Sequence, residues 1–347
     1  MPKAQPTTLA TDLETVDCDL CGSGKMAPYL EAPDCNWPIQ SNHLGAAAPS
    51  ASWSLVQCQE CGLVYLNPRP TAAELARHYP KDYYAYSSAP ARPGSGVRRS
   101  LKLFLRRRRR LWSLLRHSPL RARFFDPLVE TLGWIDVGAI LDVGCGSGGF
   151  LDQLAPHGWT TYGVDISREG IEEARRHGHQ GWLGDLTALD LPHDLVDVVR
   201  MSHVLEHTPS PRRTLTAVRE VLRPGGLLLV EVPDAGSIWT PVFREHSWLW
   251  DLPRHFYHFT TTTLTRLANE TGFEVRELRR RSTPRYILQS MAVSLLHAEN
   301  APAMSEPIDP ATLLKDPQLL ESLEPFCRHL EKLGQGNSLL LIAACTK

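Results

Sequence analysis

The sequence contains no apolar segment long enough to cross a membrane. Its longest uninterrupted apolar run, Leu339–Cys345, has seven residues, whereas a spanning helix needs about 20. The first seventeen residues include three acidic side chains and no apolar stretch, so we expect no secretory signal peptide. These absences predict a protein without a membrane span.

The cysteines are not arranged as a disulfide framework. Four of the eight form two Cys-x-x-Cys pairs, and the other four are scattered along the chain. Structural disulfides belong mainly to oxidising compartments, whereas paired thiols in a reducing setting favour metal binding. We therefore expect a cytoplasmic protein with metal-binding cysteine pairs.

Net charge is also almost absent, because 37 basic residues are balanced by 38 acidic ones. Hydrophobic and charged contents of 42% and 22% are ordinary for a soluble globular protein. A chain of 347 residues leaves room for about two domains. The basic residues are unevenly placed, since residues 92–123 contain twelve of them and no acid.

The most informative segment is Leu141–Phe150, which reads LDVGCGSGGF. The apolar run Ala139–Val143 predicts a buried strand, and the glycines after it predict a tight turn into a helix. Glycines at 144 and 146 remove side chains that would keep a ligand from the backbone, and the free N–H groups of a helix start attract polar ligands. The segment therefore indicates a ligand-binding loop.

Four further strand patterns follow this loop. Tyr162–Asp165 ends a second strand with a carboxylate suited to a ribose diol, and Gly184-Asp185-Leu186 ends a third. Val196–Met201 is a fourth, and a turn with the sequence LRPGG leads into a fifth, Leu227–Val232. Strands and helices that alternate in this way predict a doubly wound α/β sheet, in which ligands bind at the carboxyl ends of the strands.

Five of these motifs, LDVGCGSG, YGVD, GDL, MSHVLEH and LRPGG, occur in this order over residues 139–232 and together resemble a class I S-adenosylmethionine-dependent methyltransferase. The resemblance implies a Rossmann-like fold with a mostly parallel seven-stranded sheet. It implies that the loop residues bind the methionine end of the cofactor and that the acid after the second strand holds the ribose. The residues after the third strand are implied to contact the adenine. The implied cofactor-binding residues are Asp142, Gly144, Cys145, Gly146, Asp165, Ile166, Asp185, Leu186 and Met201.

A nicotinamide-binding Rossmann domain is the alternative interpretation of the glycine-rich loop. It is disfavoured because the acid before the first glycine and the Arg-Pro-Gly-Gly turn do not belong to that fingerprint.

Two cysteine knuckles define a small N-terminal module. Each consists of Cys-x-x-Cys followed by glycine, which permits the positive φ of the turn. Two such knuckles supply four soft ligands in the tetrahedral arrangement that zinc prefers. The sequence therefore predicts one structural zinc, held by Cys18, Cys21, Cys58 and Cys61. A redox-active pair would not explain why the motif occurs twice.

The residues after the second knuckle, LVYLNPRP and YPKDYY, resemble the N-terminal portion of bacterial methyltransferases that act in sugar, glycan and natural-product pathways. With them, the resemblance covers most of residues 18–275. It implies that a small metabolite is the methyl acceptor.

A basic amphipathic helix is expected after a linker at residues 87–96. Apolar residues recur there at helical spacing, and Arg106–Arg110 form a dense basic run. This run is either a solvated helix face, the interpretation that we favour, or a phosphate-binding surface for a nucleotide-linked substrate or nucleic acid. Contact with an anionic membrane surface is a third alternative.

Candidate catalytic residues lie after the fourth and fifth strands. Removal of a proton from a hydroxyl or carbon acceptor requires a base, and an imidazole is suited to it near neutral pH. His203 and His207 share a face if their segment is helical. In the ubiquinone O-methyltransferase branch a matching acidic cluster binds a divalent metal, but here a histidine stands in an acidic position. The second region, Trp248–Thr260, has the aromatic and polar composition of a pocket. The catalytic candidates are His203, His255, Tyr257 and His258.

The rest of the chain completes the expected fold. Thr263–Thr271 predicts a short helix, Phe273–Leu278 a sixth strand, and Asn337–Cys345 a seventh, antiparallel strand. We expect a disordered N-terminus (1–17), a zinc-binding module (18–70), a linker with the basic helix (71–125) and a methyltransferase domain (126–347). Within that domain, residues 286–334 should be mainly helical and either cap the substrate side or form a homodimer contact.

Two functions remain in competition. The first is methyl transfer from S-adenosylmethionine to an oxygen or carbon of a small metabolite, with zinc as a scaffold. The second is RNA methylation, in which the zinc module and the arginine-rich helix hold phosphates. The near-neutral charge and the absence of an Asn-Pro-Pro-aromatic signature disfavour RNA.

Overall fold

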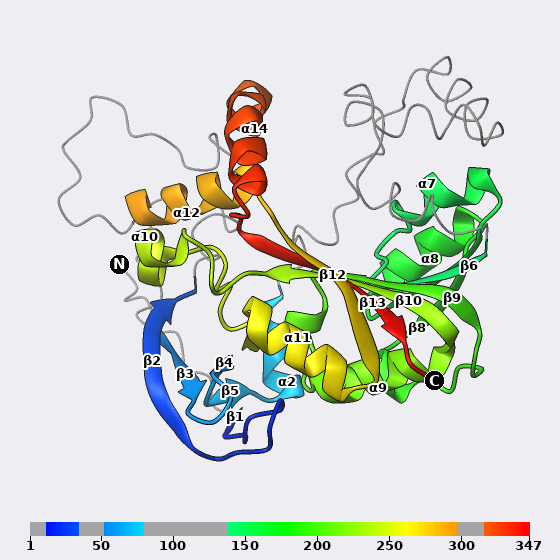
Figure 1. Cartoon of the computed structure of the whole chain (residues 1–347), viewed down its shortest axis with the longest axis horizontal. Coiled ribbons are helices and arrows are strands. Elements are labelled where there is room, and N and C mark those ends of the chain that lie inside the picture. Colours follow the sequence, from blue (N-terminus) through cyan, green and yellow to red (C-terminus); the bar gives the residue numbers. More distant parts are fainter. Residues whose placement is uncertain (1–11, 35–51, 80–137, 297–315) are drawn as a thin grey trace, which may run out of the picture. The chain divides into compact units, whose positions relative to one another are not determined.

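The computed structural model describes residues 12–34, 52–79, 138–296 and 316–347 (Figure 1). The linker and the basic run Arg106–Arg110 lie outside the described residues. The chain divides into two compact units, one of residues 1–83, 201–220 and 227–347, and the other of residues 84–200 and 221–226. Strands β9 and β10 contribute residues to both.

A seven-stranded sheet has the strand order β12-β13-β10-β9-β6-β7-β8. β6, β7 and β8 pair in parallel, whereas β13 is antiparallel to both β10 and β12. The predicted mostly parallel sheet and its antiparallel last strand are thus confirmed. The strands are β6 (Ala139–Val143), β7 (Thr160–Asp165), β8 (Gln180–Leu183), β9 (Val196–Ser202), β10 (Leu222–Pro233), β12 (Phe273–Arg281) and β13 (Ser338–Cys345).

The described residues of the unit around β6, β7 and β8 include two α-helices, α7 (Leu151–Leu154) and α8 (Arg168–Arg176). Ser167 begins α8, because its hydroxyl accepts a hydrogen bond from the Gly170 N–H at 3.0 Å. The helix buries Ile171 and Ala174 and packs against β7 and β8. Short 3-10 helices follow α7 (Ala155–His157) and β8 (Leu186–Ala188).

The N-terminal part of the other unit consists of two small sheets. A four-stranded sheet has the order β11-β4-β3-β2, and a two-stranded sheet pairs β1 with β5. Part of the segment expected to be disordered is therefore a strand, because Leu13 and Glu14 pair with Pro70 and Arg69. The elements are β1 (Leu13–Glu14), β2 (Met26–Pro33), β3 (Ser52–Cys58), β4 (Val64–Leu66), β5 (Arg69–Pro70), α2 (Ala72–Leu75), a 3-10 helix (Ala76–His78) and β11 (Tyr257–His258).

β11 joins the N-terminal sheet although it lies far along the chain. Tyr257 pairs with Tyr65 and His258 with Val64 in an antiparallel ladder. The expected zinc module at 18–70 is thus completed by residues from the second candidate catalytic region.

Helices account for most of the remaining described residues of this unit. α11 begins with a capping box between Thr260 and Thr263, ends before Gly272 and packs against β12 and β13. Residues 286–334 were expected to be mainly helical, and the described parts of this segment lie largely in α12 and α14, which contact each other. Residues 297–315 lie outside the described residues. None of the described helices is long and apolar enough to cross a membrane. The elements are a 3-10 helix (Leu205–His207), α9 (Pro211–Val221), α10 (Thr240–Phe243), a 3-10 helix (Arg244–His246), α11 (Thr261–Glu270), α12 (Pro284–Leu296) and α14 (Pro317–Lys332).

Candidate functional site

The loop after β6 has the backbone geometry that its glycines allow. Gly144, Gly146 and Gly148 have φ values of 73°, 51° and 86°, in the region that favours glycine. A Cβ on Gly170 would lie only 3.1 Å from the backbone of Gly146, so glycine there lets α8 approach the loop. The loop therefore presents backbone groups, rather than side chains, to a ligand.

Asp165 links this loop to the start of α8. One carboxylate oxygen accepts a hydrogen bond from the Gly146 N–H at 2.7 Å, and the other accepts one from the Ser167 N–H at 2.8 Å. Each carboxylate oxygen has two lone pairs, so each retains a position for a ribose hydroxyl. The fixed carboxylate thus fits the predicted role, which stays a prediction.

The residues expected around the adenine lie at the ends of β7 and β8. Ile166 is 65% exposed, an unusual value for a large apolar side chain directly after a buried strand. Asp185 accepts hydrogen bonds from the N–H and hydroxyl of Thr187, and Leu186 is buried. An exposed apolar side chain beside Asp165 is consistent with contact to an aromatic base.

Asp142 has a partner that the sequence analysis did not identify. Its side chain is buried and accepts a hydrogen bond from Arg200 at 2.8 Å. The Arg200 guanidinium also lies over the ring of Phe150, 4.1 Å from its centroid. Burial raises the pKa of Asp142, against the attraction of Arg200. A basic residue near the end of the otherwise mostly apolar segment Val196–Met201 was the signal available in the sequence.

Cys145 and Met201 are both buried. The Cys145 sulfur packs where a Cβ on Gly163 would lie, and burial raises the pKa of the thiol. A protonated, buried thiol is inert. These two residues can therefore offer a cofactor only their backbone.

The four knuckle cysteines form a compact cluster. Their sulfur atoms all lie within 4.8 Å of one another, with Cys18–Cys61 at 3.4 Å and Cys21–Cys58 at 3.5 Å. Tetrahedral zinc with Zn–S bonds of about 2.3 Å places its sulfurs about 3.8 Å apart. Burial raises the pKa of Cys61 to about 11, whereas backbone hydrogen bonds outweigh burial and lower that of Cys58 to about 7. The donor set and its spacing fit zinc.

The first knuckle is tied to the start of α9. The Asp19 carboxylate accepts hydrogen bonds from the Ser210 hydroxyl at 2.6 Å and the Arg212 N–H at 2.8 Å. The Arg212 guanidinium donates to the carbonyls of Asp19 and Leu20. A structural metal in the knuckle would therefore also hold the start of α9.

A buried carboxylate lies between two of the candidate histidines. Glu206 is 0% exposed, and neither of its carboxylate oxygens has a hydrogen-bond partner among the described residues. Its Oε1 lies 3.4 Å from His203 Nδ1 and 3.9 Å from His255 Nε2. The segment is not α-helical, because a 3-10 helix covers only Leu205–His207 and His203 has a φ of 55°. This backbone turn directs His203 toward Glu206.

His203 and His255 differ in access. The His203 side chain is 30% exposed, and the Tyr286 hydroxyl lies 3.1 Å from its Nδ1 and 3.3 Å from its Nε2. His255 is buried and its Nδ1 lies 3.0 Å from the Leu249 carbonyl. Burial lowers the pKa of His255 against the attraction of Asp251. Of the two, His203 can reach a substrate more readily.

His207 belongs to the same cluster. Its ring packs edge-on against that of His255 with 4.5 Å between centroids, and its Nδ1 lies 3.1 Å from the Arg254 carbonyl. Burial, and then the neighbouring His255, lower the pKa of His207 to about 4. His207 is therefore neutral at physiological pH and serves packing.

Tyr257 and His258 are buried in β11. The Tyr257 hydroxyl accepts a hydrogen bond from Arg69 at 3.0 Å and donates to the Pro209 carbonyl at 3.1 Å. His258 packs edge-on against Trp250, and burial holds its pKa well below the ordinary value. Both have structural contacts, and their catalytic role stays a prediction.

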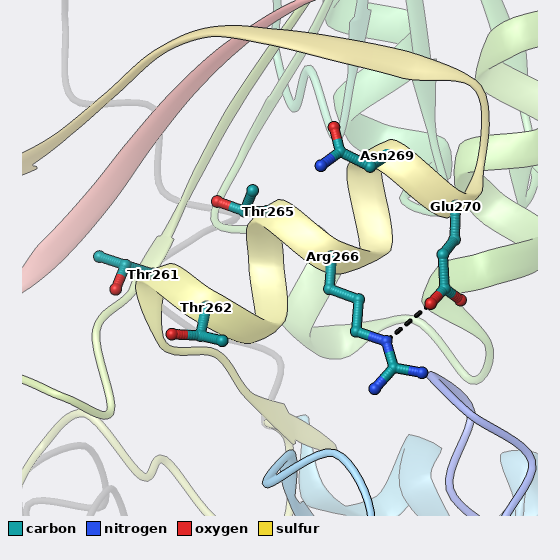
Figure 2. A pocket seen from close by; sticks show the side chains of 6 residues that line it. All are labelled: Thr261, Thr262, Thr265, Arg266, Asn269 and Glu270. Atoms are coloured by element: carbon teal, nitrogen blue, oxygen red, sulfur yellow. Dashed lines mark hydrogen bonds and ion pairs between the residues drawn. The ribbon is translucent and has the colours of Figure 1, made fainter.

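A pocket of about 450 Å³ lies along α11, and none of the candidate residues lines it. Figure 2 shows its lining, in which the Arg266 guanidinium pairs with Glu270 at 2.6 Å. Its remaining lining side chains are those of Thr261, Thr262, Thr265 and Asn269. Since one exposed helix face supplies all six, no catalytic group is brought together there.

Residues 104–278, half of the chain, match the model of a family described as a methyltransferase domain. A protein of Streptomyces fradiae from transposon Tn4556, called uncharacterized, is 39% identical over 107 residues. These cover 28% of this chain and only 31% of that protein. A ubiquinone biosynthesis O-methyltransferase of Thiobacillus denitrificans is 28% identical over 48% of this chain and 84% of its own.

A solved Thermotoga maritima structure, titled as a possible histamine N-methyltransferase, is 20% identical with a TM-score of 0.41. The match covers 62% of this chain and 86% of the Thermotoga chain. The matched family, together with the motifs and sheet order described above, identifies the class of the protein. The chain belongs to the methyltransferase-domain family and is an S-adenosylmethionine-dependent methyltransferase.

Proposed function

We propose that the protein transfers the methyl group of S-adenosylmethionine to a hydroxyl oxygen of a small metabolite, such as a sugar, glycan precursor or natural product. A structural zinc in the cysteine cluster holds the N-terminal sheet. The O-methyltransferase name of the Thiobacillus relative supports oxygen as the acceptor atom.

The observation that carries the proposal is the pairing of His203 with the buried Glu206. Because Glu206 Oε1 lies 3.4 Å from Nδ1 of His203, the carboxylate favours the tautomer with its proton on Nδ1. Nε2, 3.3 Å from the Tyr286 hydroxyl, then carries the lone pair that accepts a proton, and the imidazolium that forms is stabilised by the adjacent carboxylate. Glu206 is thus a positioning residue for His203.

When bound, the cofactor would supply a methyl group on a sulfonium, and the demethylated cofactor would leave as a neutral thioether. The chain contributes orientation and proton removal, which are the usual contributions of a protein to such transfers. As the acceptor oxygen bonds the methyl carbon, its hydroxyl proton passes to Nε2 of His203.

The test is the turnover of a panel of hydroxylated metabolites and nucleotide-linked sugars, measured as release of the demethylated cofactor. His203→Ala should lower turnover by about 10²–10⁴-fold, the usual contribution of a general base, with cofactor affinity retained. The acidic limb of the pH–rate profile should be lost in the same variant. His193→Ala, which changes an exposed histidine outside the cluster, should behave as wild type.

His255→Ala separates the two candidate bases. We expect a smaller loss of turnover with the acidic limb intact, because His255 is buried. If His203→Ala keeps wild-type turnover on an accepted substrate, the proposed base is wrong. Loss of the acidic limb in His255→Ala instead would assign proton removal to His255.

A further inference from the structure

Asp152, His177 and His179 bring three metal-ligand atoms together, and none of them belongs to the cysteine cluster or to the candidate catalytic histidines. Asp152 lies on α7, His177 follows the last residue of α8, and His179 comes just before β8 (Figure 1). Gly178, with a φ of 92°, turns the chain between the two histidines. Their ligand atoms and that of Asp152 all lie within 4.8 Å of one another.

The spacing of these atoms suits a common metal ion. Asp152 Oδ2 lies 3.0 Å from His177 Nδ1, and Asp152 Oδ1 lies 3.2 Å from His179 Nε2. Ligands bonded to one ion at about 2.1 Å, at octahedral to tetrahedral angles, lie about 3.0–3.4 Å apart. The Asp152 carboxylate therefore contacts both imidazoles, one through each of its oxygens.

The outer nitrogen of each ring also has a partner. His177 Nε2 lies 3.1 Å from Glu173 Oε1, and His179 Nδ1 lies 2.9 Å from the Thr161 hydroxyl. Histidines that ligate metals almost always donate their second N–H to a carboxylate, carbonyl or water, which orients the ring. The Glu173 contact fits that pattern, and a hydroxyl can accept the same N–H.

His177 can satisfy both of its ring nitrogens in two ways: protonated, when it donates to two carboxylates, or neutral with a bound ion. Its two nitrogens face two carboxylates, those of Asp152 and Glu173. A neutral imidazole has one N–H and can donate to only one of them. With an ion between Nδ1 and Asp152, the lone pair of Nδ1 binds the metal and Nε2–H donates to Glu173.

We propose that Asp152, His177 and His179 bind a divalent transition-metal ion, with zinc as the reference ion. Two imidazoles and one carboxylate suit zinc, cobalt or nickel, whereas magnesium and calcium prefer oxygen ligands alone. Asp152 and His177 are each about one-third exposed. An open coordination position is therefore left for water.

The choice of variants follows from burial. The His179 side chain is 1% exposed and packs against the cofactor loop. A Cβ added to Gly148 would lie only 2.7 Å from Cδ2 of the His179 ring. Replacing His179 would disturb the cofactor loop. His177→Ala and Asp152→Asn change the more exposed ligands instead, and His193→Ala is the matched control. Glu173→Gln removes the orienting carboxylate and, with it, the ion pair of Glu173 with Arg176.

The experiment is equilibrium dialysis of the full-length protein at a fixed micromolar free zinc concentration, followed by elemental analysis. Wild type and His193→Ala should bind one zinc more per chain than His177→Ala and Asp152→Asn. Glu173→Gln should bind it about 10–100-fold more weakly, the usual effect of losing an orienting partner. Zinc should raise the thermal midpoint of wild type more than that of His177→Ala, in which only the cysteine cluster remains to bind it.

The proposal is overturned if wild type binds no more zinc than His177→Ala. It is also overturned if Asp152→Asn retains the additional equivalent. Circular dichroism and cofactor affinity matching wild type establish that each variant is folded. Since zinc bound by the cysteine cluster is common to all variants, it cancels in the comparison.

Discussion

Replacement of His207 by glutamine should reduce the dependence of the free energy of unfolding on pH. His207 is buried against His255, and its pKa is about 4 in the folded protein, compared with about 6.5 in an unfolded chain. As pH falls below 6.5, the unfolded state gains a proton that the folded state does not. The stability present above pH 6.5 is therefore lost as pH falls toward 4.

The magnitude follows from the two pKa values. At pH 5 the unfolded histidine is almost fully protonated and the folded one is mostly neutral. The difference corresponds to about 2 kcal/mol of lost stability relative to neutral pH. Asp251 does not offset this loss, because Arg254 outweighs burial and holds the pKa of its carboxyl below the ordinary value.

Glutamine at position 207 suits the measurement because its amide can donate to the Arg254 carbonyl, which His207 Nδ1 contacts at 3.1 Å, and it does not titrate. Urea unfolding followed by circular dichroism at pH 7 and pH 5 gives the free energies. Wild type should lose about 2 kcal/mol more than His207→Gln between these pH values. His193→Gln, at an exposed site, should lose as much as wild type. Equal losses in wild type and His207→Gln would show that His207 is not held neutral by burial.

Three further predictions concern the cofactor and zinc sites. Asp165→Ala should weaken S-adenosylmethionine binding by about 1.5–3 kcal/mol in calorimetry, the scale of hydrogen bonds to a charged group, whereas Ser167→Ala, which removes only the helix cap, should retain affinity. Cys58→Ser should lose zinc in elemental analysis while Cys327→Ser keeps it, and equal zinc in both would remove the cysteine site. Arg200→Met should cost about 3–5 kcal/mol in urea unfolding, because a buried carboxylate loses its partner. Adding Asp142→Asn should restore part of this, and a double variant as unstable as the single one would contradict the pairing.

The elements around the cofactor loop could be predicted because their signals are local. Ala139–Val143 is a strand as expected, since four of these five residues are apolar and a glycine-rich turn follows them. The last strand could also be placed, because Leu339–Cys345 is uniformly apolar, and the strand Ser338–Cys345 is buried along its whole length. Cysteine spacing likewise predicted a cluster, because two knuckles with glycine turns each direct two thiols to one side.

The candidate catalytic region could not be resolved in the same way. Trp248–Thr260 has the composition of a pocket, yet Tyr257 and His258 pair with β4 and are buried. Composition does not distinguish a polar residue that lines a pocket from one satisfied inside a core. Glu206 was identified only as part of a motif, because its distances to His203 and His255 depend on a backbone turn and on a loop fifty residues away.

The sequence by itself determined the order of the strands along the chain, the glycine turns and the residue types at the strand ends, because these follow from periodicity and backbone sterics over a few neighbours. Only the tertiary structure decided which charges meet: Arg200 with Asp142, Glu206 with His203, and Asp152 with His177 and His179. Burial and distance are properties of contacts between segments remote in sequence, and the pKa of a histidine or carboxylate follows from them.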